Sequence, residues 1–200
     1  MCFVFGWFAT LATAATPPIL VLGDSLSAAH GIAVKDGWVS LLTERLQAAT
    51  PPRAVVNASI SGETTAAGLA RLPQLLTDHQ PALVIVELGA NDGLRGLPLA
   101  EARANLVKIL TAVRAAGAHA LLVGIELPVN YGPQYRDGLR SMYRGLADEF
   151  NAPLLPFLLD GVALDPDLMQ DDGLHPNAKA QPKVLDNVWA VLQPALRDLR

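Results

Sequence analysis

Short apolar runs recur along this chain, and three of them stop abruptly at a polar loop that contains glycine. Residues 18–22 (PILVL) end at Gly-Asp-Ser, residues 54–60 (AVVNASI) end at Ser-Gly-Glu, and residues 83–88 (LVIVEL) end at Gly-Ala-Asn-Asp. A short apolar run next to glycine is typical of a buried strand. A run as nearly continuous as residues 83–88 is expected where a sheet is covered on both faces, as parallel sheets are.

The segments between these runs contain apolar residues at helical spacing, capping residues or a glycine that ends a helix. They predict helices at about residues 38–48, from Thr64 or Thr65 onward, at about 102–117, at about 135–150 and from about Val184 to Ala195. Two further strands are expected at residues 120–125 and 153–155. We expect Pro73 to interrupt the second helix and Pro194 to kink or fray the last one. Strands that alternate with helices predict an α/β fold, a three-layer α/β/α domain with a parallel sheet.

The composition favours one folded domain over residues 16–200. Of the 200 residues, 51% are hydrophobic and only 17% are charged, which argues against disorder. The net charge of −4 and the lack of a Lys/Arg cluster argue against a nucleic-acid partner. We therefore expect a small-molecule substrate, and nothing in the sequence indicates more than a monomer.

Residues 1–15 (MCFVFGWFATLATAA) contain no charged side chain. The run is shorter than the ~18 apolar residues of a spanning helix. Ala12-Thr13-Ala14 matches an A-x-A cleavage site, so a signal peptide is expected, although its start lacks the usual Lys or Arg. The mature chain would then be periplasmic or secreted, with no stable membrane span. It would also lack disulfides, because the only cysteine, Cys2, lies in this segment.

Three polar loops of the predicted sheet carry residues suited to acyl transfer. In a parallel sheet the carboxyl ends of all strands lie at one edge, so Ser25, Gly62 and Asn91 are expected to converge there. A serine nucleophile needs a base, usually a histidine that a carboxylate orients. Asp172 and His175 are three residues apart and project the same way from a turn, whereas the neighbouring Asp171 points elsewhere.

Acyl transfer also requires donors for the negative charge that develops on the carbonyl oxygen. The candidates are the backbone N–H groups of Ser25 and Gly62 and the side-chain amide of Asn91. Each residue has an ordinary structural interpretation as well: Ser25 as a helix cap, Gly62 as a turn residue, and Asp172 as the cap of the last helix. Their joint placement at one sheet edge favours a catalytic site. The other histidines, His30, His79 and His119, are expected to be solvated.

Four blocks of this sequence resemble those of the SGNH, or GDSL, hydrolase superfamily. They are residues 23–27 (GDSLS), Gly62, residues 89–92 (GAND) and residues 172–176 (DGLHP), in the family's order and spacing. The nearest resemblance is to the bacterial periplasmic thioesterase I/lysophospholipase/arylesterase group. It implies a flavodoxin-like, five-stranded parallel sheet of order 2-1-3-4-5 and an acyl ester or thioester substrate, with no cofactor and no metal.

The same resemblance assigns roles to individual residues. It implies Ser25 as nucleophile, His175 as base and Asp172 as the orienting acid, with Ser25, Gly62 and Asn91 as the oxyanion hole. The segments that would border an acyl groove follow Asn91 and surround residues 128–131. The substrate-binding candidates are Asp24, Leu94, Leu127, Asn130 and Tyr131.

Other functions compete with acyl ester hydrolysis. One is a carbohydrate O-acetylesterase of the same superfamily. A metal-dependent phosphohydrolase would use the acidic side chains near His175, namely Asp165, Asp167, Asp171 and Asp172, but these lack a strand-borne D-x-D-x-T pattern. A nucleotide or flavin binder would be expected to carry a phosphate-binding glycine motif, and neither the G-x-G-x-x-G nor the P-loop pattern is present. The G-x-S-x-G elbow of the α/β-hydrolases is absent too.

Overall fold

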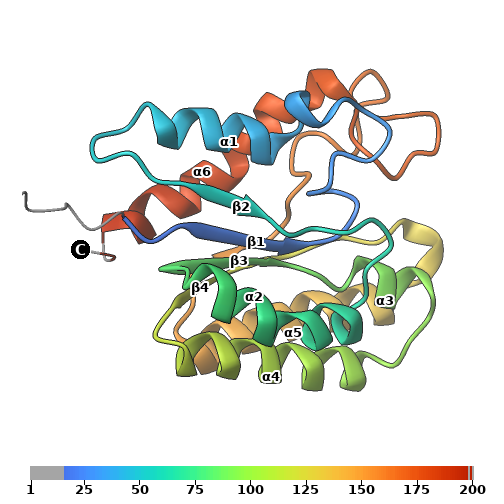
Figure 1. Cartoon of the computed structure of the whole chain (residues 1–200). Coiled ribbons are helices and arrows are strands. Elements are labelled where there is room, and N and C mark those ends of the chain that lie inside the picture. Colours follow the sequence, from blue (N-terminus) through green and yellow to red (C-terminus); the bar gives the residue numbers. More distant parts are fainter. Residues whose placement is uncertain (1–15, 198, 200) are drawn as a thin grey trace, which may run out of the picture.

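The computed structural model describes residues 16–197 and residue 199. Its centre is a five-stranded sheet of order β2-β1-β3-β4-β5 in which all neighbouring strands are parallel (Figure 1). The strands are β1 (Ile19–Gly23), β2 (Val55–Asn57), β3 (Leu83–Glu87), β4 (His119–Val123) and β5 (Leu154–Leu155). The predicted sheet and its strand order are confirmed.

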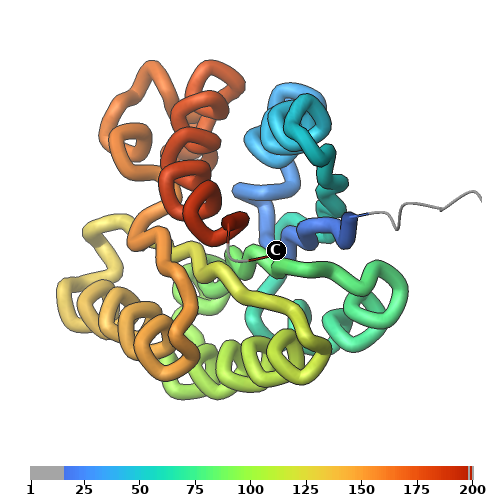
Figure 2. Tube along the Cα trace, turned by 90° about the vertical axis from the view of Figure 1, so that its left-hand side faces the viewer, coloured from blue at the N-terminus to red at the C-terminus, as the bar shows by residue number. Residues whose placement is uncertain are grey.

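Helices cover both faces of this sheet, which confirms the three-layer architecture. One face carries α1 (Trp38–Gln47) and α6 (Gln181–Arg197) (Figure 1). The other carries α2 (Thr65–His79), α4 (Leu99–Ala115) and α5 (Pro133–Phe150), and Figure 2 shows the two groups from the end of the sheet. Short helices follow the strands: η1 (Val34–Asp36), α3 (Ala90–Leu94), η2 (Val129–Tyr131) and η3 (Ala178–Ala180).

The central strands explain why the sequence runs 18–22 and 83–88 are so apolar. Every residue of β1 and β3 is buried, because helices pack on both sides of these strands. One polar side chain interrupts this pattern, since Glu87 ends β3 without any exposed surface. The carboxyl ends of these buried strands therefore form a rigid edge of the sheet, and the polar loops begin there.

The second strand is shorter than predicted. Instead of residues 54–60 it spans only Val55–Asn57. The side chain of Asn57 accepts a hydrogen bond from the N–H of Ser59 at 3.1 Å, which forms a local turn that competes with the regular ladder. The chain still follows β1 beyond this point, because the N–H of Ile60 donates to the carbonyl of Gly23 at 3.1 Å.

The prediction that Pro73 interrupts the second helix was wrong. Helix α2 runs from Thr65 to His79 through this proline, and Thr64 caps it by accepting a hydrogen bond from the N–H of Ala67. Pro73 is exposed, so the carbonyl group that its ring leaves without an N–H partner lies on the side that faces water. Helix α6 continues past Pro194 to Arg197, and the kink or fraying expected at this proline stays a prediction.

Residues 1–15, the predicted signal peptide, lie outside the residues that the structure describes. Within the described part of the chain, no helix combines the length and the apolar character needed to cross a membrane.

Gly124, which follows β4, leaves no room for a side chain. A Cβ atom there would lie 2.3 Å from the backbone oxygen of Pro156. We expect Gly124→Ala to lower the free energy of unfolding by about 1–3 kcal/mol, since a rigid backbone atom must move. Gly145, within α5, has no atom within 4 Å of such a Cβ. Gly145→Ala is the control and should stabilise the helix by about 0.5–1 kcal/mol. Urea unfolding measures both, and equal effects of the two substitutions would contradict the packing argument.

Candidate active site

Ser25 lies in the loop directly after β1 and contacts His175 from the far end of the chain. Its Oγ is 2.9 Å from Nε2 of that histidine, a distance at which the hydroxyl donates to an unprotonated imidazole nitrogen. The His175 side chain is 17% exposed, so the pair is open to a small molecule but partly shielded from water.

Asp172 holds the other side of the imidazole. Nδ1 of His175 lies 2.6 Å from Oδ2 of Asp172, while Oδ1 accepts the backbone N–H groups of Leu174 at 2.8 Å and His175 at 3.0 Å. Partial burial acts to raise the pKa of Asp172, but these hydrogen bonds outweigh it and lower the pKa to about 2. The carboxylate is therefore mainly ionised above this value. Its contribution to stability is complete above the ordinary pKa of 3.8 and is lost as the pH falls from there through about 2.

The loop that carries His175 is fastened to the loop that carries Ser25. The side-chain amide of Gln170 donates to the carbonyl of His30 at 2.8 Å and to that of Pro176 at 3.0 Å. The rings of His30 and His175 also lie close together, with centroids 4.5 Å apart. His30 is exposed, as predicted, but no sequence pattern indicated that it lies beside His175.

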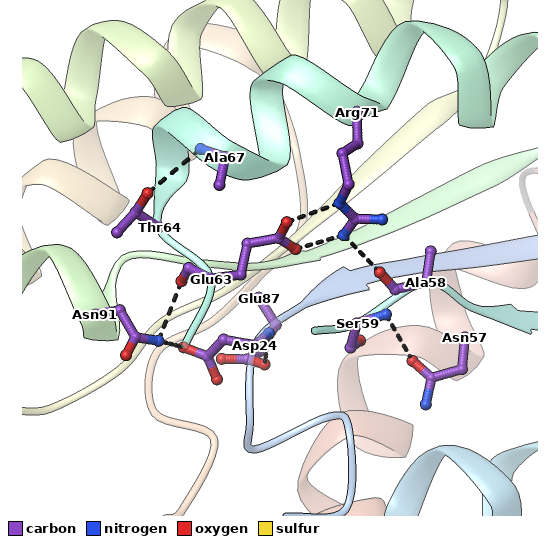
Figure 3. Close-up of polar contacts among 10 residues, drawn as sticks. All are labelled: Asp24, Asn57, Ala58, Ser59, Glu63, Thr64, Ala67, Arg71, Glu87 and Asn91. Carbon is purple, nitrogen blue, oxygen red and sulfur yellow. Dashed lines mark hydrogen bonds and ion pairs between the residues drawn. The ribbon is translucent and has the colours of Figure 1, made fainter. Parts of the chain in front are cut away.

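Asn91 links the loops of the other two candidate oxyanion donors, because it contacts Asp24 beside Ser25 and Glu63 beside Gly62. Among the hydrogen bonds of the described residues, none uses the N–H group of Ser25 or of Gly62. The side-chain amide of Asn91 donates to Oδ2 of Asp24 at 3.0 Å and to the carbonyl of Glu63 at 3.1 Å (Figure 3). These two acceptors fix the orientation of the amide, and the second ties it to the loop of Gly62.

A buried ion pair supports the loop that contains Gly62. Glu63 is almost completely buried, and Arg71 from α2 binds both of its carboxylate oxygens (Figure 3). The same guanidinium donates to the carbonyl of Ala58 at 2.7 Å. Arg95 donates to the carbonyl of Gly62 at 2.8 Å from the other side. Gly62 itself has a φ of +80°, a conformation that favours glycine.

A small apolar cavity of about 50 Å³ adjoins the serine and the imidazole. Its lining comes from the loops after β1, β3, β4 and β5 and from the His175 loop: Ser25, Leu26, Ala90, Asn91, Leu94, Ile125, Glu126, Leu127, Pro128, Leu159, Leu174 and His175. Of the five predicted substrate-binding residues, Leu94 and Leu127 line this cavity. Tyr131 does not line it, but its hydroxyl donates to the carbonyl of Leu94 at 3.3 Å. Asn130 is exposed, and Asp24 is completely buried and faces Asn91 instead of the cavity.

A larger cavity lies elsewhere. It measures about 1210 Å³ at the opposite edge of the sheet, where Gly117, His119 and Asn151 line it. The polar side chains of this cavity do not form a combination suited to acyl transfer. Within the described residues, no three His, Cys, Asp or Glu side chains gather closely enough to hold a metal ion. The smaller cavity, beside Ser25 and His175, is therefore the candidate active site.

Residues 21–181, which include all of these site residues, match the GDSL-like lipase/acylhydrolase family. The chain belongs to this family. It is 50% identical over 183 residues to Esterase TesA of Pseudomonas aeruginosa, across 92% of this chain and 91% of the relative. It is 48% identical over 192 residues to Thioesterase 1/protease 1/lysophospholipase L1 of Escherichia coli (strain K12), across 96% of this chain and 91% of the relative.

A solved structure of an esterase has the same fold as this chain. The psychrotrophic esterase EstA from Pseudoalteromonas sp., in a structure inhibited by monoethylphosphonate, has a TM-score of 0.86 and 42% identity across 90% of this chain and 99% of its own. The resemblance inferred from the four sequence blocks is confirmed. Membership of an acylhydrolase family also favours acyl hydrolysis over the phosphohydrolase and nucleotide-binding alternatives.

Proposed function

We propose that this protein is a serine hydrolase that cleaves acyl esters and thioesters through an acyl-enzyme on Ser25. One observation supports this proposal above all others: Ser25, His175 and Asp172 form a continuous chain of contacts of 2.9 Å and 2.6 Å at the mouth of an apolar cavity. A nucleophile, a base and an orienting acid in hydrogen-bond contact are the requirements of a catalytic triad.

The proposed reaction begins with attack of Ser25 Oγ on the carbonyl carbon of the bound acyl group. Nε2 of His175 takes the hydroxyl proton, and the negative charge of Asp172 stabilises the imidazolium that results. The carbonyl oxygen becomes negative and accepts hydrogen bonds from the N–H groups of Ser25 and Gly62 and from the amide of Asn91. In the free protein both N–H bonds of this amide are donated, to Asp24 and to the carbonyl of Glu63, so the one to Glu63 is exchanged for the one to the oxyanion. The tetrahedral intermediate collapses when the C–O or C–S bond to the leaving group breaks, and the imidazolium gives its proton to the leaving group.

Deacylation repeats these steps with water as the nucleophile. His175 takes a proton from water, whose oxygen attacks the acyl carbon, and the same donors hold the oxyanion. The bond to Ser25 Oγ then breaks and the hydroxyl recovers its proton from His175. None of these reaction steps depends on the identity of the first leaving group. An alcohol and a thiol are therefore both compatible with the mechanism.

The cavity supports an acyl group as the part of the substrate that the protein recognises. Its lining is mainly aliphatic, with Leu94, Leu127, Leu159 and Leu174 among its residues. With a volume of about 50 Å³, it accommodates only a few carbons, so longer chains must extend over the rim. The relatives' names include an esterase, a thioesterase and a lysophospholipase, which agrees with an acyl group as the common element.

A fluorophosphonate probe tests the proposal directly. We expect it to attach covalently to Ser25, as mass spectrometry of the labelled peptide would show, and to abolish hydrolysis of p-nitrophenyl esters in proportion to labelling. EDTA should leave hydrolysis unchanged. Labelling of a different residue, or loss of activity in EDTA, would rule out the proposed mechanism.

A panel of p-nitrophenyl esters, acyl-CoA thioesters, lysophospholipids and acetylated sugars separates the substrate classes. Preference for acetylated sugars over every other class would favour the carbohydrate O-acetylesterase.

We also propose that the enzyme is exported and monomeric. Export rests on the sequence of residues 1–15, and the monomeric state on the absence of any sequence signal for assembly.

A further inference from the structure

Strand β3 ends in a carboxylic acid that the mechanism above does not use. Glu87 has no exposed surface, and none of the ion pairs of the described residues includes it. One of its oxygens, Oε1, is buried without a hydrogen-bond partner. A buried charge without compensation is so unfavourable that such a group takes up a proton instead.

The other oxygen of Glu87 fastens both ends of the turn that presents Ser25. Oε2 accepts the N–H of Asp24 at 3.2 Å and the hydroxyl of Ser27 at 2.7 Å. Gly23 makes room for this arrangement, because a Cβ atom on it would lie 2.8 Å from Oε2. The carboxyl group thus lies directly behind the proposed nucleophile and fixes the residues on either side of it.

Asp24 extends this contact to the proposed oxyanion hole. Its carboxylate is completely buried, accepts the N–H of Leu26 at 3.0 Å through Oδ1, and accepts the amide of Asn91 at 3.0 Å through Oδ2. Figure 3 shows Glu87 beside Asp24, with Asn91 on the far side of Asp24. One path of contacts therefore joins the end of β3, the turn of Ser25 and the amide of Asn91.

The two acids titrate differently. Burial raises the pKa of Glu87 well above its usual value, and the nearby charge of Asp24 raises it further. Burial also raises the pKa of Asp24, to about 6, although His175 and the hydrogen bonds from Leu26 and Asn91 act in the opposite direction. The buried phenol of Tyr143 from α5 is also close to Glu87. Burial and the lack of an ion-pair partner favour the neutral form of Glu87, whereas the hydrogen bonds from Leu26 and Asn91 favour the charged form of Asp24.

We propose that Glu87 is a positioning residue that acts as a neutral carboxylic acid, fixing the turn of Ser25 and, through Asp24, the amide of Asn91. This inference rests on the proposed function, because it assigns Glu87 a part in the same reaction. Glu87 touches neither the substrate nor the imidazole. It sets the distance and direction between the nucleophile and one oxyanion donor.

Two substitutions of similar size test this role. Glu87→Gln keeps a carbonyl oxygen that accepts hydrogen bonds and cannot ionise, whereas Glu87→Met removes every polar atom. For a p-nitrophenyl ester we expect Gln to keep kcat within about 3-fold and Met to lower kcat about 10–100-fold with little change in KM, because a small misplacement of reacting groups is costly. Glu101, exposed on α4, provides the matched controls Glu101→Gln and Glu101→Met, which should leave kcat unchanged.

A second measurement reports the protonation of Glu87 without reference to activity. The unfolded chain releases this proton above the ordinary glutamate pKa of 4.5, whereas the folded protein retains it. The free energy of unfolding of the wild type therefore falls as the pH rises above 4.5. Glu87→Gln does not show this fall, because its amide does not titrate. In urea unfolding between pH 5 and pH 8, the stability of Glu87→Gln relative to wild type should therefore rise with pH.

A constant difference in stability across this range, or a loss of kcat in Glu87→Gln as large as in Glu87→Met, would overturn the inference. If Glu87→Met does not fold, the glutamine variant decides alone: retained kcat with a pH-dependent gain supports the role, and any other result refutes it. A wild-type protein without esterase activity would contradict the proposed function. An active wild type with normal kcat in Glu87→Met would contradict only the role of Glu87.

Discussion

Replacing Ser25 with alanine should lower kcat for ester hydrolysis by about 10⁴–10⁶, because the members of a triad act as a unit and lose most of their effect together. The substitution removes a single oxygen atom, the one that lies 2.9 Å from Nε2 of His175. The cavity and the oxyanion donors are unaffected by this change, so substrate should still bind. We therefore expect KM to change little while the fluorophosphonate probe no longer labels the protein.

Ser40→Ala is the matched control for Ser25→Ala. The hydroxyl of Ser40 lies in α1 and donates to the carbonyl of Val34 at 2.7 Å, away from the cavity. This variant should keep full activity and full labelling. Steady-state kinetics on purified protein give the comparison, provided that a contaminating host esterase is excluded by a mock purification. A Ser25→Ala protein that retains even a tenth of the wild-type rate would show that another group is the nucleophile.

The sheet and the convergence of the site could be predicted because both follow from simple patterns. The runs at residues 18–22 and 83–88 are apolar because both faces of β1 and β3 are covered, and parallel strands bring their carboxyl ends to one edge. Ser25 and Asn91 lie just beyond these two strands. The geometry of a parallel sheet therefore places them near each other, even though residues 25 and 91 are 66 positions apart in the sequence.

The parts that sequence could not predict depend on tertiary contacts. Pro73 does not end α2, because packing of the apolar face of that helix outweighs the local penalty of one exposed proline. Glu87 looks like an ordinary polar residue at the end of a strand, and only its complete burial behind Asp24 distinguishes it. His30 lies beside His175 only because Gln170 fastens the two loops. Nothing in the local sequence of these residues encodes such neighbours.

Replacing Asn91 with alanine should lower kcat by about 10²–10³, the usual cost of removing one oxyanion donor. In the free protein the amide of Asn91 donates to Asp24 and to the carbonyl of Glu63, which hold it in place before substrate arrives. The acyl group in the ground state carries little negative charge, so this donor acts mainly on the transition state. We therefore expect kcat to fall much more than KM rises.

Asn91→Asp tests whether charge development explains this effect. An aspartate keeps the size of asparagine, but it would place a second carboxylate beside Asp24 and a negative charge where the oxyanion forms. Its kcat should fall below that of Asn91→Ala at pH 8, and the gap should narrow at lower pH as the new carboxyl group takes up a proton. Asn151→Ala, at the opposite edge of the sheet, controls for loss of an asparagine: its φ of 50° makes alanine less stable there, but kcat should not change. If Asn91→Asp were as active as wild type, the amide of Asn91 would not be a donor to the oxyanion, because a carboxylate cannot donate that hydrogen bond.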